Sequence, residues 1–358
     1  MYSIKGVCEC LGMEFVKPGA DNSGYYVCPF CGSQKLNVNY EKNVWRCNKC
    51  NESGNPKTLV EKVMLVSRYD AFCFLDENRL YLETCEETPQ QNTYANKIAS
   101  ENTLNKTYST LLSILDLDKA HKKDLIKRGL TESAIKKLKI KSVLDEDSYW
   151  IPKKLIKLGC TLEGVPGFYK EENTWKINVY PGGYLIPFIN FNEKITGFQI
   201  RNMKPTKKAG KYITISSTGK NNGTKSQLPV HLIGFNGQKS VLITEGALKA
   251  DIATFLFYKK FHKKVAIMAI PGVNNTKYIP EVLEFLKSKG VTKIYDAIDM
   301  DKIGNEDVEK NIHVEKAMKK IKSIVLAHDL EFKTLIWNKE KGIDDFLLSK
   351  ILSSKKRA

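Results

Sequence analysis

The segment KIYDAIDMD, from Lys293 to Asp301, begins like a buried strand and ends in carboxylates. Asp296, Asp299 and Asp301 crowd this end of the segment. Carboxylates held close together repel one another when ionised, so such a group needs a positive partner beside it. The segment therefore predicts a strand end at which something positive is held.

Strand and helix patterns alternate on both sides of this segment. Four strand patterns are each followed by a helical pattern: SVLITEG, KVAIMAIPG, KIYDAID and FKTLIW. This alternation indicates a parallel α/β sheet, and ligands of such sheets bind at the carboxyl ends of the strands. Glu245, Asp299 and Asp301 all fall at such ends, so we expect them at one edge of the sheet.

A divalent metal is the expected positive partner. Mg²⁺ prefers oxygen ligands, binds through one or two carboxylates, and keeps waters and substrate phosphates around it. A metal held there would orient and neutralise a phosphoryl group. Alternatively, Asp299 and Asp301 only cap the loop into the next helix. Glu245, at the equivalent end of an earlier strand, favours the metal.

The region before the sheet is basic. Residues 201–225 contain seven Lys or Arg and no acidic residue, which suits a phosphate backbone or a triphosphate. The alternative is a solvated loop, but the strand pattern KYITISS within it argues against that. Upstream, two strands are expected around a turn at residues 190–194, and a helical pair over residues 108–140.

Four cysteines form two CxxC pairs with fifteen residues between them, in CPFCGSQKLNVNYEKNVWRCNKC. Cys28, Cys31, Cys47 and Cys50 at this spacing predict a zinc ribbon whose two turns offer four thiolates to Zn²⁺. The metal could serve only as a small core. Equally, basic residues interleaved with aromatic ones on the ribbon, such as Arg46 and Trp45, could grip phosphates and stack on bases.

Composition points to an anionic partner. The net charge is +17 and the pI about 9.3, which is typical of proteins that bind nucleic acid, although a lysine-rich proteome is the alternative. No run of 18 apolar residues predicts a membrane span, and the N-terminus lacks the apolar core of a signal peptide. We expect a cytoplasmic protein with reduced thiols.

At these motifs the chain resembles a known family. The TEG strand end with DMD resembles a Toprim domain, and the ribbon ahead of it is similar to that of DnaG-type and phage primases. GFQIR, GKYITISS and KGIDDFL are similar to a basic-ridge segment, a Lys-Tyr segment and a closing acidic motif of primases. EGALKAD, IPGVNN and RGLTESAI look closest to primase-like proteins of mobile genetic elements in Gram-positive bacteria.

The resemblance implies a multidomain α/β and α+β fold. Its parts are a zinc β-ribbon domain (1–76), a polar linker (77–106), a mixed α/β basic primase-core subdomain (107–235) and a parallel α/β Toprim domain (236–350).

It also implies a DNA primase, a nucleotidyltransferase that makes short primers, expected to be RNA, on single-stranded DNA from nucleoside triphosphates. Zn²⁺ would be structural and Mg²⁺ or Mn²⁺ catalytic. Glu245 would serve acid/base chemistry or metal binding, and Asp299 and Asp301 would bind the metal. The implied nucleic-acid or nucleotide contacts are Arg201, Lys204, Lys211, Lys249, Trp45 and Arg46, and the implied outer carboxylates are Asp251, Asp344 and Asp345.

The chain departs from the DnaG pattern in several ways. Its ribbon has four cysteines where a histidine is common, and Lys249 stands where the family has an acidic residue, with Asp251 nearby. The chain ends soon after the Toprim helix, so we expect a separate replicative helicase as partner. Two other functions stay open: a Toprim nuclease, and a non-catalytic single-stranded-DNA-binding replication factor.

Overall fold

The computed structural model describes residues 2–20, 22–77, 97–143, 147–179, 182–205 and 210–355. The chain divides into two units, Met1–Asn92 and Thr93–Ala358. Most of the predicted linker lies outside the described residues. None of the described helices combines the length and apolar character that a membrane span requires.

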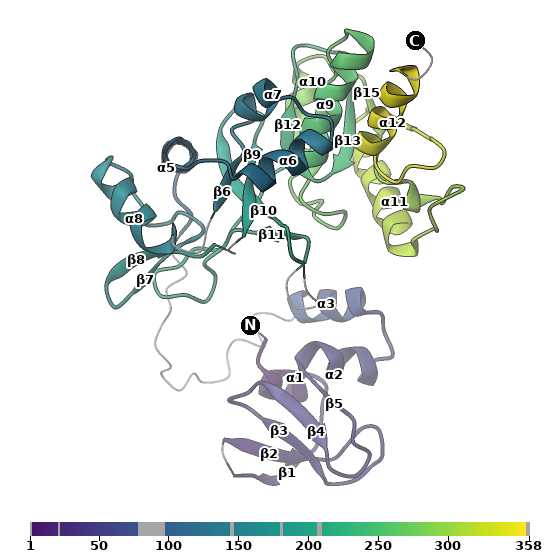
Figure 1. The fold of residues 1–358 in the computed structure, drawn as a ribbon. Coiled ribbons are helices and arrows are strands. Elements are labelled where there is room, and N and C mark those ends of the chain that lie inside the picture. The colour runs from purple at the N-terminus through teal and green to yellow at the C-terminus, as the bar shows by residue number, and fades with distance from the viewer. Residues whose placement is uncertain are drawn as a thin grey trace. The chain divides into compact units, whose positions relative to one another are not determined.

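Unit 1 is built on a five-stranded antiparallel sheet in sequential order (Figure 1). Its strands are β1 (Phe15–Pro18), β2 (Ser23–Tyr26), β3 (Leu36–Asn39), β4 (Val44–Cys47) and β5 (Ser53–Gly54). Its helices are α1 (Ile4–Cys10), α2 (Pro56–Val63) and α3 (Arg68–Glu77). Leu36 and Val38 of β3 are buried together with Trp45 of β4.

Unit 2 contains a C-terminal sheet with strand order β12-β14-β13-β15-β16. Its strands are β12 (His231–Ile233), β13 (Ser240–Glu245), β14 (Ile267–Ile270), β15 (Lys293–Asp296) and β16 (Glu331–Thr334). Strands β13 to β16 are parallel as predicted, whereas β12 pairs antiparallel with β14. β12 thus belongs to this sheet, although the sequence placed residues 107–235 in the preceding subdomain.

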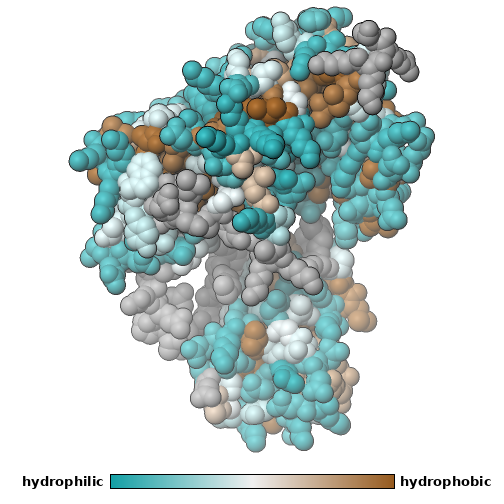
Figure 2. Space-filling view, in the orientation of Figure 1, coloured by the Kyte–Doolittle hydropathy of each residue, from teal (hydrophilic) through white to brown (hydrophobic). Residues whose placement is uncertain are grey.

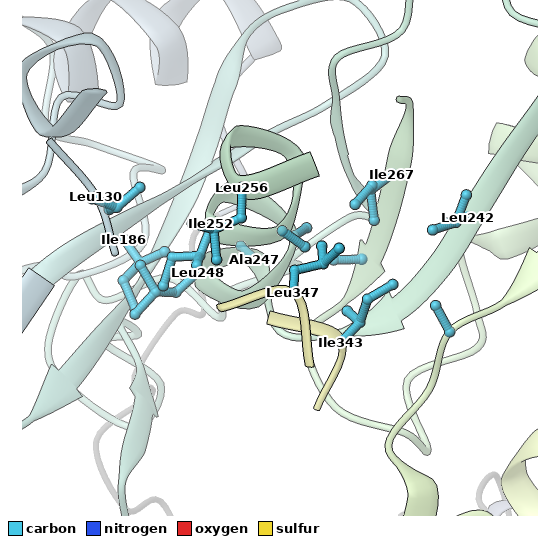
Figure 3. Close-up of a cluster of buried hydrophobic side chains, with 14 of the residues drawn as sticks. Leu130, Ile186, Leu242, Ala247, Leu248, Ile252, Leu256, Ile267, Ile343 and Leu347 are labelled. Carbon is cyan, nitrogen blue, oxygen red and sulfur yellow. The ribbon is translucent and has the colours of Figure 1, made fainter. Parts of the chain in front are cut away.

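Helices cover both faces of this sheet. They are α9 (Ala247–Phe261), α10 (Ile279–Ser288), α11 (Ile312–Ala327) and α12 (Ile343–Lys355). Leu242 and Ile267 face α9 and α12 in one apolar cluster (Figure 3). Val241 and Met268, their neighbours along the strands, face α10 and α11 in another. The alternation along β13 and β14 therefore builds three layers, as the patterns predicted.

A second sheet, of order β11-β10-β9-β6, occupies the earlier part of unit 2. Its strands are β6 (Lys141–Val143), β9 (Gly183–Ile189), β10 (Ile195–Asn202) and β11 (Tyr212–Thr214), with a separate hairpin of β7 (Phe168–Glu171) and β8 (Thr174–Ile177). The predicted turn at residues 190–194 joins β9 to β10. Tyr184 and Ile186 of β9 share the cluster of α9, so both sheets contribute to one core.

The helices that precede β9 in the chain differ from the expected pair. They are α5 (Glu101–Ile114), α6 (Lys119–Lys127), α7 (Glu132–Lys137) and α8 (Asp147–Lys157). Asp118 accepts backbone N–H bonds as the cap of α6, so the first helix of the expected pair is divided into α5 and α6. The second helix of the pair is confirmed as α7, which Thr131 caps. The predicted linker, residues 77–106, ends too late in the chain, because α5 begins at Glu101 with Ser100 as its N-cap.

Candidate carboxylate site and four-cysteine cluster

The four predicted cysteines meet in unit 1. Their ligand atoms all lie within 4.8 Å of one another, and the Sγ–Sγ distances are 3.8 Å for Cys28–Cys50 and 3.7 Å for Cys31–Cys47. Four sulfurs about 2.3 Å from a tetrahedral Zn²⁺ would be separated by about 3.8 Å. The cluster therefore has the donor set and the spacing of a structural zinc site.

The thiols of this cluster differ in acidity. Burial raises the pKa of Cys28 to about 12. Burial also opposes ionisation of Cys47, but N–H groups of Cys50 and Lys49 and the Ser33 hydroxyl outweigh it and bring its pKa to about 6. Four thiolates at these distances need a cation to coexist, and Zn²⁺ would supply the charge.

Trp45 does not form the base-stacking surface that the sequence suggested. Only 1% of it is exposed, its indole N–H donates to the Asn55 carbonyl, and its ring packs on Phe30. Its side chain is part of the small core of unit 1, whereas Val44, which precedes it on β4, is exposed. Arg46 is exposed and stays a candidate for phosphate contact.

In unit 2 the predicted carboxylates gather at the carboxyl edge of the C-terminal sheet. Glu245 ends β13, and Asp299 and Asp301 follow β15, its parallel neighbour. Asp299 holds the N-cap position of a short 3₁₀ turn, η1 (Met300–Lys302), but its side chain makes no capping hydrogen bond. The N-cap of α11 is Asn311. The loop-capping alternative therefore does not explain this aspartate pair.

Two lysines supply positive charge at this edge. The Lys249 ammonium donates to Asp299 Oδ1, and Lys341 Nζ lies 2.6 Å from Asp301 Oδ2. Burial raises the pKa of Glu245, and the nearby Asp299 and Asp301 carboxylates add to the rise while Lys249 opposes it. Burial alone would lower the pKa of Lys249, but Asp299, Asp344 and Glu245 outweigh it, so its pKa is raised.

The donor set at this edge suits a hard divalent cation. Asp301 Oδ1 and Asp344 Oδ1 are buried and have no hydrogen-bond partner among the described residues. Carboxylate oxygens are the ligands that Mg²⁺ and Mn²⁺ prefer. Among the described residues, however, only the cysteine cluster brings at least three candidate metal-ligand atoms together. Asp299 and Asp301 are each paired with a lysine.

The outer carboxylates divide into two groups. Asp344 accepts from Arg128 at 2.8 Å, and burial raises the pKa of Asp345, with Asp344 adding to the rise. Asp251 instead lies 3.2 Å from His231 Nε2, with both side chains buried. The expected role of Asp251 behind the metal ligands is therefore replaced by a pairing with β12.

A buried ion pair beneath the carboxylates was not predicted from the sequence. Lys302 Nζ lies 2.9 Å from Asp296 Oδ2, and neither side chain is exposed. Asp296 ends β15 and Lys302 ends η1, so the pair closes the loop that carries Asp299 and Asp301. The one signal for it was a basic residue directly after the DMD motif.

Three of the predicted basic contacts, Arg201, Lys204 and Lys211, lie on β10 or between β10 and β11. Arg201 of β10 lies over the Tyr212 ring at 5.2 Å, and its buried Nε and Nη1 have no hydrogen-bond partner among the described residues. Lys204 and Lys211 are exposed. Arg128 was not predicted, and it links the Tyr212 region to Asp344. Its long-range partners left no local signal in the sequence.

Comparison with known proteins bears on the fold and on the resemblance. No protein-family model matches the chain. A DNA primase of Lactococcus lactis subsp. lactis (strain IL1403) is 24% identical over 197 residues, which is 54% of this chain and 31% of that relative. The match thus spans about a third of the relative.

Two solved structures share the fold. The zinc-binding and RNA polymerase domains of the Aquifex aeolicus primase match with a TM-score of 0.52 at 15% identity, over 98% of this chain and 82% of that one. The RNA polymerase domain of the Mycobacterium tuberculosis primase DnaG matches with a TM-score of 0.51 at 13% identity, over 70% and 80%. The resemblance to DnaG-type primases is thereby confirmed, and the chain has the fold of the zinc-binding and RNA polymerase domains of a bacterial primase.

Proposed function

We propose that the chain is a DNA primase that makes short primers on single-stranded DNA by metal-dependent nucleotidyl transfer. The observation that carries this proposal is the set of carboxylates Glu245, Asp299 and Asp301 at one sheet edge, within a primase fold. Nuclease and non-catalytic functions are not favoured, because the similar proteins are primases.

Asp299, Asp301 and Glu245 are the residues that would hold Mg²⁺ or Mn²⁺. When bound, the ion would orient the α-phosphate and neutralise the charge that develops there. Glu245, whose pKa is raised by burial, is the proposed acceptor of the proton of the attacking 3′-hydroxyl. Positioning and charge stabilisation would supply most of the rate.

The basic side chains would hold the substrates. Arg201 has two buried guanidinium nitrogens with no hydrogen-bond partner among the described residues. The exposed Lys204 follows the strand of Arg201, and the exposed Lys211 precedes β11 and accepts a backbone hydrogen bond from Asn202. Guanidinium and ammonium groups bind phosphate oxygens of a template or a triphosphate. The ribbon in residues 1–76 is the proposed module for template engagement, with Arg46 as its phosphate contact.

Primer synthesis with a matched pair of aspartate variants tests the proposal. Asp299→Asn removes a proposed metal ligand. Asp329→Asn changes an aspartate that also pairs with a lysine, Lys287 at 2.8 Å, but precedes β16 and so lies at the amino edge of the sheet. Each protein is incubated with single-stranded DNA, labelled nucleotides and Mg²⁺ or Mn²⁺.

We expect template-dependent short oligomers from the native chain and from Asp329→Asn, and none from Asp299→Asn. Shortened DNA in place of oligomers would identify a nuclease. Tight DNA binding by all three proteins with no product of either kind would identify a binding factor. Equal synthesis by both variants would remove Asp299 from the chemistry.

A further inference from the structure

Lys249 is placed where a cation is unfavourable on local grounds. It lies in the first turn of α9, which has neither an acidic residue nor a side-chain cap in that turn. A helix N-terminus carries partial positive charge and repels a lysine. An interaction from outside the helix must therefore hold the ammonium group in place.

That interaction is the bond to Asp299. The side chains of Lys249 and Asp299 are only 17% and 11% exposed, so water screens their attraction weakly. Gly342 makes room for the ammonium: a Cβ there would lie 3.2 Å from Lys249 Cε and 2.6 Å from Asp344 Oδ1. The lysine is thus enclosed by the carboxylates and by a close approach of the backbone.

The charges around this lysine do not balance. The cluster joins five carboxylates to three cations, which leaves a formal charge of −2, the charge that one divalent ion neutralises. Its carboxylates are Glu245, Asp299, Asp301, Asp344 and Asp345, and its cations are Lys249, Lys341 and Arg128.

We propose that Lys249 and the divalent metal compete for Asp299, so that the ammonium group must leave this carboxylate before the metal binds it. The proposal rests on the proposed function, because it takes Asp299 as a metal ligand. A metal ion about 2.1 Å from Asp299 Oδ1 would occupy the place that the ammonium holds, and the two cations repel.

The competition gives Lys249 a positioning role toward the substrate. The first turn of α9 and two of the carboxylates face the same sheet edge, so an ammonium released from Asp299 stays near bound phosphate. The anionic group that fits it is the phosphate chain of a nucleoside triphosphate, whose oxygens accept charge-assisted hydrogen bonds. The free chain would therefore bind metal weakly until a triphosphate receives the lysine.

Mn²⁺ binding to the zinc-loaded full chain, followed by electron paramagnetic resonance without nucleotide, tests the competition. Removal of a unit charge about 4 Å from a divalent ion is expected to tighten binding at least about tenfold, so Lys249→Met should gain that much. Lys259→Met is the matched control, because Lys259 lies in the last turn of the same helix against Phe255. Its Mn²⁺ affinity should equal that of the native chain.

A Lys249→Met protein that binds Mn²⁺ no more tightly than the native chain overturns the proposal. If its circular dichroism shows loss of fold, Lys249→Gln takes its place, because glutamine keeps a polar hydrogen-bond donor at this position without the charge. Asp299→Asn separates the two hypotheses. Unchanged Mn²⁺ affinity there removes the metal site of the proposed function, whereas lost affinity with no gain in Lys249→Met overturns the competition alone.

Chemical labelling of the native chain provides a test without substitution. Reductive methylation followed by mass spectrometry should leave Lys249 protected in metal-free buffer and label it once saturating Mg²⁺ is added. Labelling of Lys259 should not change. A Lys249 that stays equally protected at saturating Mg²⁺ contradicts its displacement.

Discussion

The ion pair between Asp296 and Lys302 gives the sharpest prediction for stability. Both side chains have 0% exposure, and Lys302 Nζ lies 2.9 Å from Asp296 Oδ2 and 3.3 Å from the Asp296 carbonyl oxygen. The other carboxylate oxygen accepts the Ile298 N–H at 2.9 Å. Lys302→Met keeps much of the side-chain volume, removes the charge, and leaves Asp296 buried without its counter-ion.

Loss of one partner from a buried ion pair costs about 3–5 kcal/mol, because the remaining charge has lost both water and its partner. For a unit of this size, that corresponds to a fall in melting temperature of roughly 6–20 °C. Replacement of both partners by apolar residues is often close to neutral. The double variant Asp296→Leu/Lys302→Met should therefore be more stable than Lys302→Met alone.

The loss of unfolding free energy in Lys302→Met should depend on pH in a defined direction. In the native chain, burial raises the pKa of Asp296 and Lys302 partly opposes the rise. Removal of the Lys302 charge should therefore raise the pKa of Asp296 further. A carboxyl group with a raised folded-state pKa favours folding below its unfolded pKa, and this contribution is lost as pH rises through the folded value. Lys302→Met should thus recover stability as the pH falls from 7 toward 4.

Urea unfolding followed by fluorescence and circular dichroism measures these differences. Lys319→Met is the control: Lys319, whose side chain is 68% exposed, pairs with the partly buried Glu315 one helical turn away, and the loss of this pair should cost no more than about 0.5 kcal/mol. A cost below about 1 kcal/mol for Lys302→Met, or a deficit that grows on acidification, would refute the buried pair.

Two further substitutions test the cysteine cluster and the carboxylate edge. Cys47→Ser should release the zinc and unfold unit 1, whereas Cys10→Ser, outside the cluster, should retain the metal. Zinc stoichiometry and circular dichroism measure both effects, and a full complement of zinc in Cys47→Ser would contradict the prediction. Gly342→Ala should lower primer synthesis by about 10²-fold without loss of zinc, because its Cβ would displace Asp344 and Lys249. Unchanged synthesis would show that the edge tolerates that shift.

The fold of the C-terminal sheet could be predicted because its signals are local. Buried parallel strands are continuous apolar runs, and each was followed by a helical period. β12 was not predicted, because it has only three residues and pairs antiparallel with β14. Helix α8 was not predicted, because its aromatic residues are typical of strands and Pro152 lies within it.

Burial within the ribbon could not be read from one sequence. Val44 and Trp45 are both apolar, and adjacent residues of a strand point to opposite faces. The register of β4 against β3, which pairs Trp45 with Val38, decides that the tryptophan is buried and the valine exposed. That choice depends on packing against α2 and Phe30, which no spacing within the hairpin reveals.

The carboxylates of the KIYDAIDMD segment suggested a metal as their positive partner, and in the structure each of them also pairs with a lysine. Asp296 is neutralised by Lys302 from the same loop, Asp299 by Lys249 from α9, and Asp301 by Lys341 from the segment before α12. Only the first of these pairs is close in sequence, so composition and spacing could predict the need for positive charge but not its source. The distinction matters for function. The buried Lys302 is fixed in the fold. Lys249 and Lys341 instead pair with the two carboxylates that are the proposed metal ligands, so a bound metal would change their partners and leave the pair of Lys302 intact.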